Sequence, residues 1–140
     1  MLPTVLNIER AFDRVTEYWS PTVIAALNGQ YVKAAKLRGE FVWHDHADED
    51  ELFLVVRGSL VIQFADGAVT LGAGECCVVP RGVRHNPVAD DECWVLLFEP
   101  AATRHTGDVV TARTRSIEEQ LTGGGPATDA SPPAPDEARA

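Results

Sequence analysis

The sequence contains few basic residues and no long apolar run. Its 140 residues include 12 Lys and Arg against 21 Asp and Glu, a formal net charge of −9 at pH 7. This composition argues against a nucleic-acid partner and against an anionic membrane surface, because both require clustered Lys and Arg. No apolar stretch approaches the ~20 residues of a membrane-spanning helix. A chain of this length is expected to form a single domain with one core.

Cysteine is also scarce. Cys76, Cys77 and Cys93 are an odd set without CxxC spacing, so they predict neither a disulfide framework nor a thiolate metal site. We interpret Cys76 and Cys77 as small buried apolar side chains, because a bond between adjacent cysteines forms a strained ring. The N-terminus lacks the basic start, apolar stretch and cleavage site of a signal peptide. A cytoplasmic protein is therefore expected.

The first part of the chain is predicted to be helical. From Asn7 to about Trp19, apolar side chains recur at three- and four-residue steps with charged residues between them. Pro21 then interrupts the pattern. We assign residues 1–29 to this N-terminal helical segment, and we expect its aromatic side chains to pack on a sheet.

Residues 30–115 are typical of an all-β domain. Short runs rich in Val, Leu, Phe and Trp are separated by turn residues, and Asp66-Gly67 between two apolar runs is a strong hairpin signal. Many short strands with closely spaced turns predict a β-sandwich or barrel. The predicted strands are Tyr31–Leu37, Phe41–His46, Glu51–Arg57, Ser59–Phe64, Ala68–Leu71, Glu75–Val79, His85–Val88 and Glu92–Glu99.

Two of these predicted strands, Glu51–Arg57 and Glu92–Glu99, are apolar on both faces. A strand with one wet face would alternate, so these two need cover on the outside as well as the inside. The N-terminal segment can supply part of that cover, and a second subunit is the other source. We therefore expect a homodimer.

The C-terminal part changes composition again. Ile117–Leu121 predicts one short helical stretch. Residues 122–140 consist mainly of Gly, Pro, Ala and acidic residues, which cannot bury enough apolar surface to offset the entropy of ordering. We predict a disordered tail there.

Three of the four histidines suggest a metal site. His44 and His46 are two residues apart, and on a strand such residues point to the same face. Glu51 follows a polar stretch long enough for a turn, and His85 follows the turn at residues 80–82, so neighbouring barrel strands can bring both to the same point. Three imidazoles and one carboxylate suit a single divalent transition metal ion. Four side-chain ligands would leave two positions open on an octahedral ion.

Two stretches resemble a known family. Residues 39–58 (GEFVWHDHADEDELFLVVRG) resemble the first conserved motif of the cupin superfamily, and residues 74–85 (GECCVVPRGVRH) resemble the second. The resemblance implies a single cupin jelly-roll β-barrel, here with a short N-terminal helix and a disordered C-terminal tail. The family's metal ligands, carried over position by position, fall on His44, His46, Glu51 and His85.

The resemblance also implies a function. It favours a metal-dependent enzyme of the dioxygenase or oxidoreductase type, acting on a small organic substrate with Fe(II), or with Mn, Ni, Co, Cu or Zn. An isomerase or lyase using the ion as a Lewis acid stays open, as does a non-enzymatic module that binds a small ligand. No catalytic residue beyond the metal ligands is assigned.

The residues around the ligands have simpler interpretations. Phe53 and Val55 share parity with Glu51 and are expected to line an apolar cavity beside the ion. Lys36 and Glu40 are interpreted as surface charges, because a bulge at the intervening glycine would break their alternation with His44.

Three further charged or polar residues lie near the motifs or beyond them. Arg81 and Arg84 are expected on the rim of the barrel. His105 lies beyond the last clear strand and is interpreted as a surface loop residue rather than a ligand.

Overall fold

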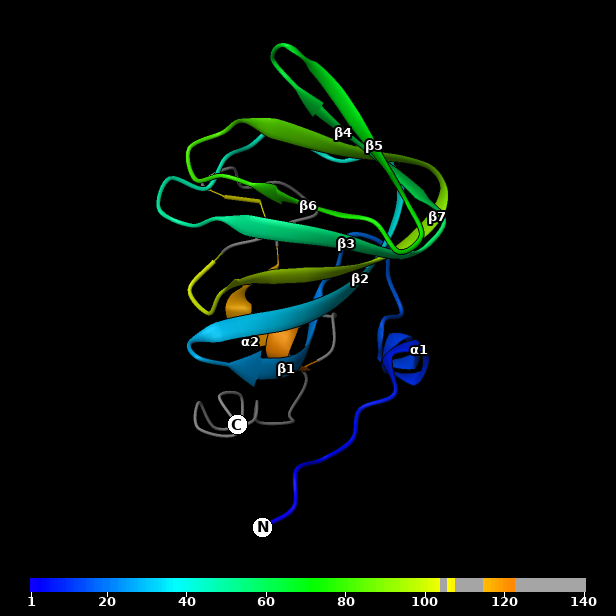
Figure 1. The fold of residues 1–140 in the computed structure, drawn as a ribbon, viewed down its shortest axis with the longest axis vertical. Helices are drawn as coiled ribbons and strands as arrows, with labels where there is room; N and C mark the ends of the chain where they lie inside the picture. Colours follow the sequence, from blue (N-terminus) through cyan, green and yellow to red (C-terminus); the bar gives the residue numbers. More distant parts are fainter. Residues whose placement is uncertain (104–105, 108–114, 123–140) are drawn as a thin grey trace.

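The computed structural model describes residues 1–103, 106–107 and 115–122. Within these residues the chain forms an antiparallel β-barrel of the predicted jelly-roll class, with short helices at its margins (Figure 1). The elements are α1 (Ile8–Ala11), η1 (Phe12–Arg14, a 3-10 turn), β1 (Thr22–Leu27), β2 (Gln30–Glu40), β3 (Glu51–Arg57), β4 (Ser59–Phe64), β5 (Gly67–Gly72), β6 (Cys76–Val79), β7 (His85–Pro100) and α2 (Ile117–Thr122).

The longest strand, β7, organises the sheet. Its second half pairs with β2 on one side and β3 on the other, in the order β1-β2-β7-β3-β6. Its first half, from His85 to Val88, pairs with β4, which forms a hairpin with β5. One continuous strand therefore pairs with β2, β3 and β4 and joins the two parts of the sheet.

Alternation along the strands separates two apolar clusters. The inner cluster includes Phe53 and Val55 of β3, and the outer cluster includes Leu54 and Val56 of the same strand. Phe12 packs into the outer cluster. The expectation that the two-faced strands are covered by the N-terminal segment is thus met. The structure describes one chain, so the homodimer stays a prediction.

The N-terminal helix is shorter than predicted. Helical backbone extends only from Ile8 to Arg14, and Thr22–Leu27, within the segment expected to be helical, is an edge strand. The two aromatic side chains of the predicted helix also separate: Phe12 joins the outer cluster, whereas Trp19 joins the inner one. The backbone becomes extended at Val15, and the chain then carries Trp19 to the other face of the sheet.

The strand predictions hold for β3 and β4, whose bounds agree with the structure. The two strands predicted at His85–Val88 and Glu92–Glu99 are one strand, β7. The strand predicted at Phe41–His46 is wrong, since that segment has only an isolated bridge between His44 and His85. Strand β7 continues because β2 pairs with it on both sides of residues 90–92, where the register shifts.

The cysteine interpretation is partly wrong. Cys93 is buried in the inner cluster, and burial raises its pKa to about 11. Cys77 is half-buried, but Cys76 is exposed. Along β6 the exposed residues Cys76 and Val78 alternate with the more buried Cys77 and Val79, so Cys76 lies on the solvent side of the strand.

The C-terminal prediction is met only where the structure describes the chain. The short helix predicted at Ile117–Leu121 is α2. The part of the predicted tail beyond Thr122 lies outside the described residues. His105 lies outside them as well. None of the helices in the described part of the chain is long and apolar enough to cross a membrane.

Candidate metal centre

Three structural elements bring the predicted ligands together. Glu51 is the first residue of β3 and His85 is the first residue of β7, while His44 and His46 lie in the loop between β2 and β3. The candidate ligand atoms of these four side chains all lie within 4.8 Å of one another, and all four residues are buried. The sequence-predicted cluster therefore exists as one compact group.

The two loop histidines reach the cluster for a different reason from the one predicted. They do not share a strand; instead, His44 exchanges backbone hydrogen bonds with His85, of 3.0 and 2.8 Å. The carbonyl of His46 accepts from the amide of Gly82 at 2.8 Å. These backbone contacts tie the loop to the turn before β7, so the imidazoles converge, with ring centroids 5.1 Å apart for His44 and His46.

Hydrogen bonds to backbone carbonyls fix the tautomers of two imidazoles. Nδ1 of His44 lies 2.8 Å from the carbonyl of Val42, and Nδ1 of His85 lies 2.9 Å from the carbonyl of Val83. A carbonyl only accepts, so each Nδ1 carries the proton. In the neutral ring Nε2 then holds the free lone pair that a metal ion needs.

The atoms that face the centre have no hydrogen-bond partner. Nε2 of His46, Nε2 of His85 and Oε1 of Glu51 are buried and unpaired, and the carboxylate oxygen lies 3.5 Å from each of these nitrogens. Buried polar atoms are rarely left unsatisfied, because desolvation without a partner is costly. A donor set of imidazoles and a carboxylate with free lone pairs could hold one metal ion.

The ionisation of the cluster also suits a cation. Burial, with a contribution from His85, lowers the pKa of His44 to about 4, which keeps that imidazole neutral. Burial also opposes the charged form of His46, but the adjacent Glu51 carboxylate, 3.5 Å away, outweighs it and raises that pKa. The carboxylate thus attracts positive charge to the centre of the cluster, and a divalent ion would supply it.

A buried ion pair, not predicted from the sequence, lies behind the carboxylate. Nζ of Lys33 is 2.7 Å from Oε1 of Glu99, and both side chains are fully buried. Burial and the charge of Glu51 hold the pKa of Glu99 well above its ordinary value, whereas burial of Glu51 is outweighed by its neighbours Glu99 and the histidines, which hold its pKa well below. The ionisation of Glu99 and that of Glu51 are therefore linked. Strand alternation offered a signal, because Lys33 and Glu99 share parity with inner-cluster residues.

An apolar cavity of about 30 Å³ adjoins the cluster on the side of His44 and Glu51. Phe53 lines it, as predicted from its parity. Trp19 and Phe41 line it as well, and their rings stack with centroids 4.5 Å apart. Neither aromatic residue was predicted there, since Trp19 comes from outside the barrel motifs and Phe41 from the loop.

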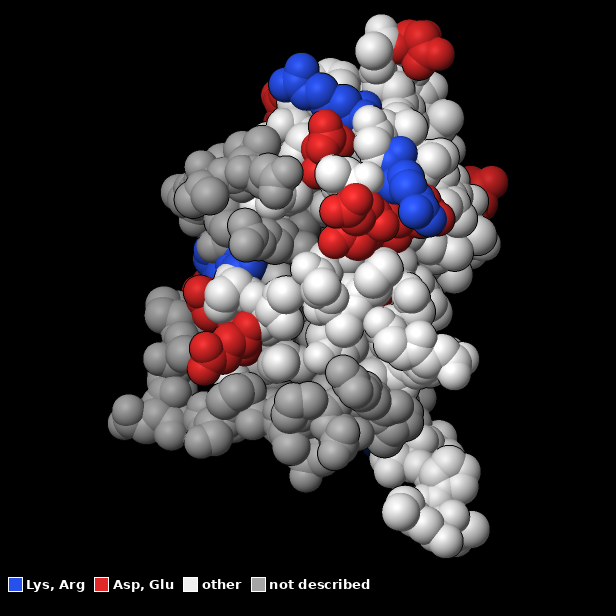
Figure 2. All heavy atoms as spheres, turned by 90° about the vertical axis from the view of Figure 1, so that its left-hand side faces the viewer, with Lys and Arg blue, Asp and Glu red and all other residues white. Residues whose placement is uncertain are grey.

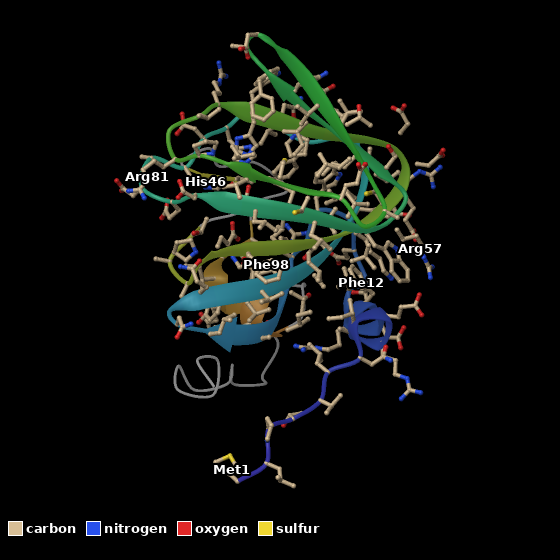
Figure 3. The ribbon with its side chains drawn as sticks, viewed as in Figure 1. Met1, Phe12, His46, Arg57, Arg81 and Phe98 are labelled. Carbon is tan, nitrogen blue, oxygen red and sulfur yellow. The ribbon has the colours of Figure 1, made fainter. Side chains whose placement is uncertain are left out.

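A second cavity, of about 210 Å³ and polar, lies against His46. Asp45, Asp48 and Glu49 line it, so the path to His46 is acidic. His46 and Arg81 both lie at this end of the barrel (Figure 3), and acidic side chains gather on the face seen from there (Figure 2). A local negative potential of this kind attracts cations.

The remaining predicted neighbours lie away from the cluster. Arg81 is exposed and pairs with Asp50, whose carboxylate lies 3.6 Å from its Nε, and Arg84 lies over the ring of Trp43. Lys36 lies over Trp94 on the outer face, because the register shifts between Leu37 and Gly39. The prediction that Lys36 is a surface charge is thus confirmed.

Comparisons with known proteins support the fold. A family model for the cupin domain matches residues 34–99. The crystal structure of a cupin-2 domain containing protein from Shewanella frigidimarina is similar, with 48% identity and a TM-score of 0.67 over 69% of this chain and 94% of that one. Uncharacterized protein YdbB from Bacillus subtilis strain 168 is 35% identical over 80 residues, which cover 56% of this chain and 71% of the relative.

A more distant structure shares the fold alone. The hydroquinone 1,2-dioxygenase PnpCD, solved in complex with Cd²⁺ and 4-hydroxybenzonitrile, is 18% identical with a TM-score of 0.57. The match covers 67% of this chain and 71% of that protein. At this identity the likeness describes the architecture of the barrel and not its chemistry.

Proposed function

Since the chain belongs to the cupin superfamily, we propose that it is a metal-dependent enzyme of the oxidoreductase type, dioxygenase chemistry included, that acts on a small organic substrate. The observation that carries the proposal is the buried cluster of three imidazoles and one carboxylate whose inward-facing atoms lack partners. The ligands would be His44, His46, Glu51 and His85.

The donor set narrows the ion to a divalent transition metal. Imidazole and carboxylate ligands suit Fe(II) and also Mn, Ni, Co, Cu and Zn. We favour Fe(II), as the resemblance of the two motifs to those of the cupin superfamily implies. When bound, such an ion would supply Lewis acidity and, if redox-active, electron transfer.

The chain's own residues would prepare the site for that chemistry. Glu99 lies behind Glu51 and favours its ionised form, which is the form that binds a metal ion. The carbonyls of Val42 and Val83 hold two imidazoles in the tautomer that exposes Nε2. The apolar wall formed by Trp19, Phe41 and Phe53 excludes bulk water from one side of the cluster.

The test begins with metal analysis of the full chain purified without chelator. We expect a single divalent ion per chain. Protein reconstituted with Fe(II) should then consume oxygen in the presence of an enediol, catechol or thiol substrate, and the uptake should require both the ion and the substrate.

Two histidine variants provide the matched control. His46→Ala should lose bound metal and oxygen uptake together, because it removes one ligand from the cluster. His105→Ala, at the histidine that the proposal does not assign as a ligand, should retain both. Metal retained by the His46 variant would refute the ligand assignment. Absence of oxygen uptake with all three substrate classes and every candidate metal would refute the oxidoreductase proposal. Isomerase activity, lyase activity and binding of a small ligand would then be measured.

A further inference from the structure

The apolar cavity beside the cluster is small enough to restrict what can enter it. A cavity needs roughly 10–15 Å³ to hold one water molecule, whereas an engineered apolar cavity of about 150 Å³ accepts benzene. The volume here is about 30 Å³. The space therefore admits a molecule of two heavy atoms and rejects an aromatic ring.

The lining disfavours water as the occupant. Nine of the eleven lining residues are apolar, and the other two are His44 and Glu51. A buried water ordinarily needs two to four polar partners. Both polar groups here belong to the ligand cluster and face its centre, so a weakly polar molecule suits the cavity better than water does.

Trp19 lines this cavity and is held by an unusual backbone. Its φ of 58° lies in the left-handed region, which is unfavourable for a non-glycine residue. Two hydrogen bonds to β2 fix it: its amide donates to the carbonyl of Lys36 at 2.9 Å, and Nε1 donates to the carbonyl of Arg38 at 2.8 Å. A residue kept in a strained conformation beside a site is a reason to seek a role for it there.

The stacked partner completes the wall. The ring of Phe41 lies parallel to the indole within 8° and meets the ring of His44 edge-on, with centroids 5.5 Å apart. The Trp19–Phe41 pair thus stands directly against one candidate ligand. The larger polar cavity adjoins a different ligand, His46. The cluster is reached from an apolar side and a polar side, and these two sides suit different molecules.

From this arrangement we infer that the apolar cavity is a binding site for a weakly polar molecule of diatomic size, such as dioxygen, and that the Trp19–Phe41 pair sets this size limit. The inference deepens the proposed function and rests on it for the chemistry of the bound molecule. The organic substrate then approaches from the polar side, next to His46.

Xenon and benzene are the probes that test the site, because neither needs a metal ion or a reaction. Xenon under pressure should occupy the cavity of the wild-type chain, and benzene should not bind there. Trp19→Gly removes the indole and tolerates the left-handed backbone, so it should bind benzene at least roughly tenfold more tightly than wild type. Phe41→Leu is a second, milder enlargement and should bind benzene to a lesser degree.

The matched control is Phe12→Leu, which alters the aromatic pair on the other face and should behave as wild type towards both probes. Absence of xenon from the wild-type cavity, or equal benzene binding by wild type and both enlarged variants, would overturn the inference. Metal content is measured on the same samples. Failure of xenon binding with metal bound therefore refutes this inference alone, and xenon binding without any metal affinity refutes the proposed function.

Discussion

The two faces of the sheet each bury a stacked aromatic pair, and the pairs have similar geometry in different surroundings. Phe12 and Trp94 stack on the outer face with centroids 4.7 Å apart, and Trp19 and Phe41 stack on the inner face with centroids 4.5 Å apart. The outer pair has the Arg57 guanidinium 3.9 Å from the Trp94 ring centroid, whereas the inner pair borders the ligand cluster. Similar packing therefore covers the sheet on one face and shapes the candidate site on the other.

Charge separates the two faces as well. The inner side carries the ligand cluster and the fully buried pair of Lys33 and Glu99. The outer cluster is apolar, with its charged partners at the surface. Phe12 and Arg57 lie at the end of the barrel away from His46 (Figure 3). The comparison predicts that mutations on the two faces can separate the stability of the fold from the binding of the proposed metal ion.

The largest expected effect is on the outer face. Phe12 is fully buried, and Phe12→Ala should lower the free energy of unfolding by about 3–5 kcal/mol through lost burial and a cavity. Denaturant unfolding measures this loss. The folded fraction should bind metal with wild-type affinity, because Phe12 does not contact the cluster. A parallel loss of metal affinity would show that the two faces are coupled.

A medium effect is expected from the buried ion pair. In the double variant Lys33→Met/Glu99→Leu, apolar side chains replace both charges, a change that is often neutral or stabilising by about 1–4 kcal/mol. Glu51 loses the neighbouring carboxyl that favours its ionised form, so metal affinity should fall about 10- to 100-fold, as measured by competition with a chelator. Unfolding in denaturant provides the second measurement.

The single variant Glu99→Leu is the control for that pair. It leaves Lys33 buried without its partner and should destabilise the protein by about 3–5 kcal/mol. An unchanged metal affinity in the folded double variant would contradict a positioning role for Glu99. Phe12→Ala should lower stability and leave metal affinity unchanged, whereas the double variant should lower metal affinity and leave stability unchanged or higher.

The smallest effect is expected at the surface of the outer face. Arg57 and Glu9 form an ion pair there. Its nitrogen and oxygen atoms are 3.0 Å apart, and the two side chains are 55% and 71% exposed. Solvent screens such a pair, so Glu9→Gln should change the unfolding free energy by less than about 1 kcal/mol. The change should shrink further in high salt. A larger loss would mean that Arg57 needs Glu9 to stay over Trp94.

Much of the fold could be predicted from local patterns. The bounds of β3 and β4 follow from apolar runs between turn residues, and α2 follows from a short periodic stretch. The errors fall where long-range pairing overrides local signals. β7 continues through acidic residues because β2 and β4 hold its backbone, and β1 forms because β2 offers an open edge.

The candidate site shows the same division. Spacing and the family resemblance named His44, His46, Glu51 and His85, and the structure brings these four together. The reason given for His44 and His46 was wrong. The two residues do not share a strand; a backbone bridge between His44 and His85 aligns their loop instead. Phe53 was correctly expected to line the cavity.

The sequence by itself determined the barrel class, most strands and the chemistry of the ligand set, because side-chain type and spacing along one strand are local properties. Only the tertiary structure decided that Lys33 and Glu99 lie behind Glu51, and that Trp19 leaves its predicted helix to close the cavity. These contacts join residues far apart in the chain. Their formation depends on strand pairing and on which face each segment covers, and no local periodicity encodes that choice.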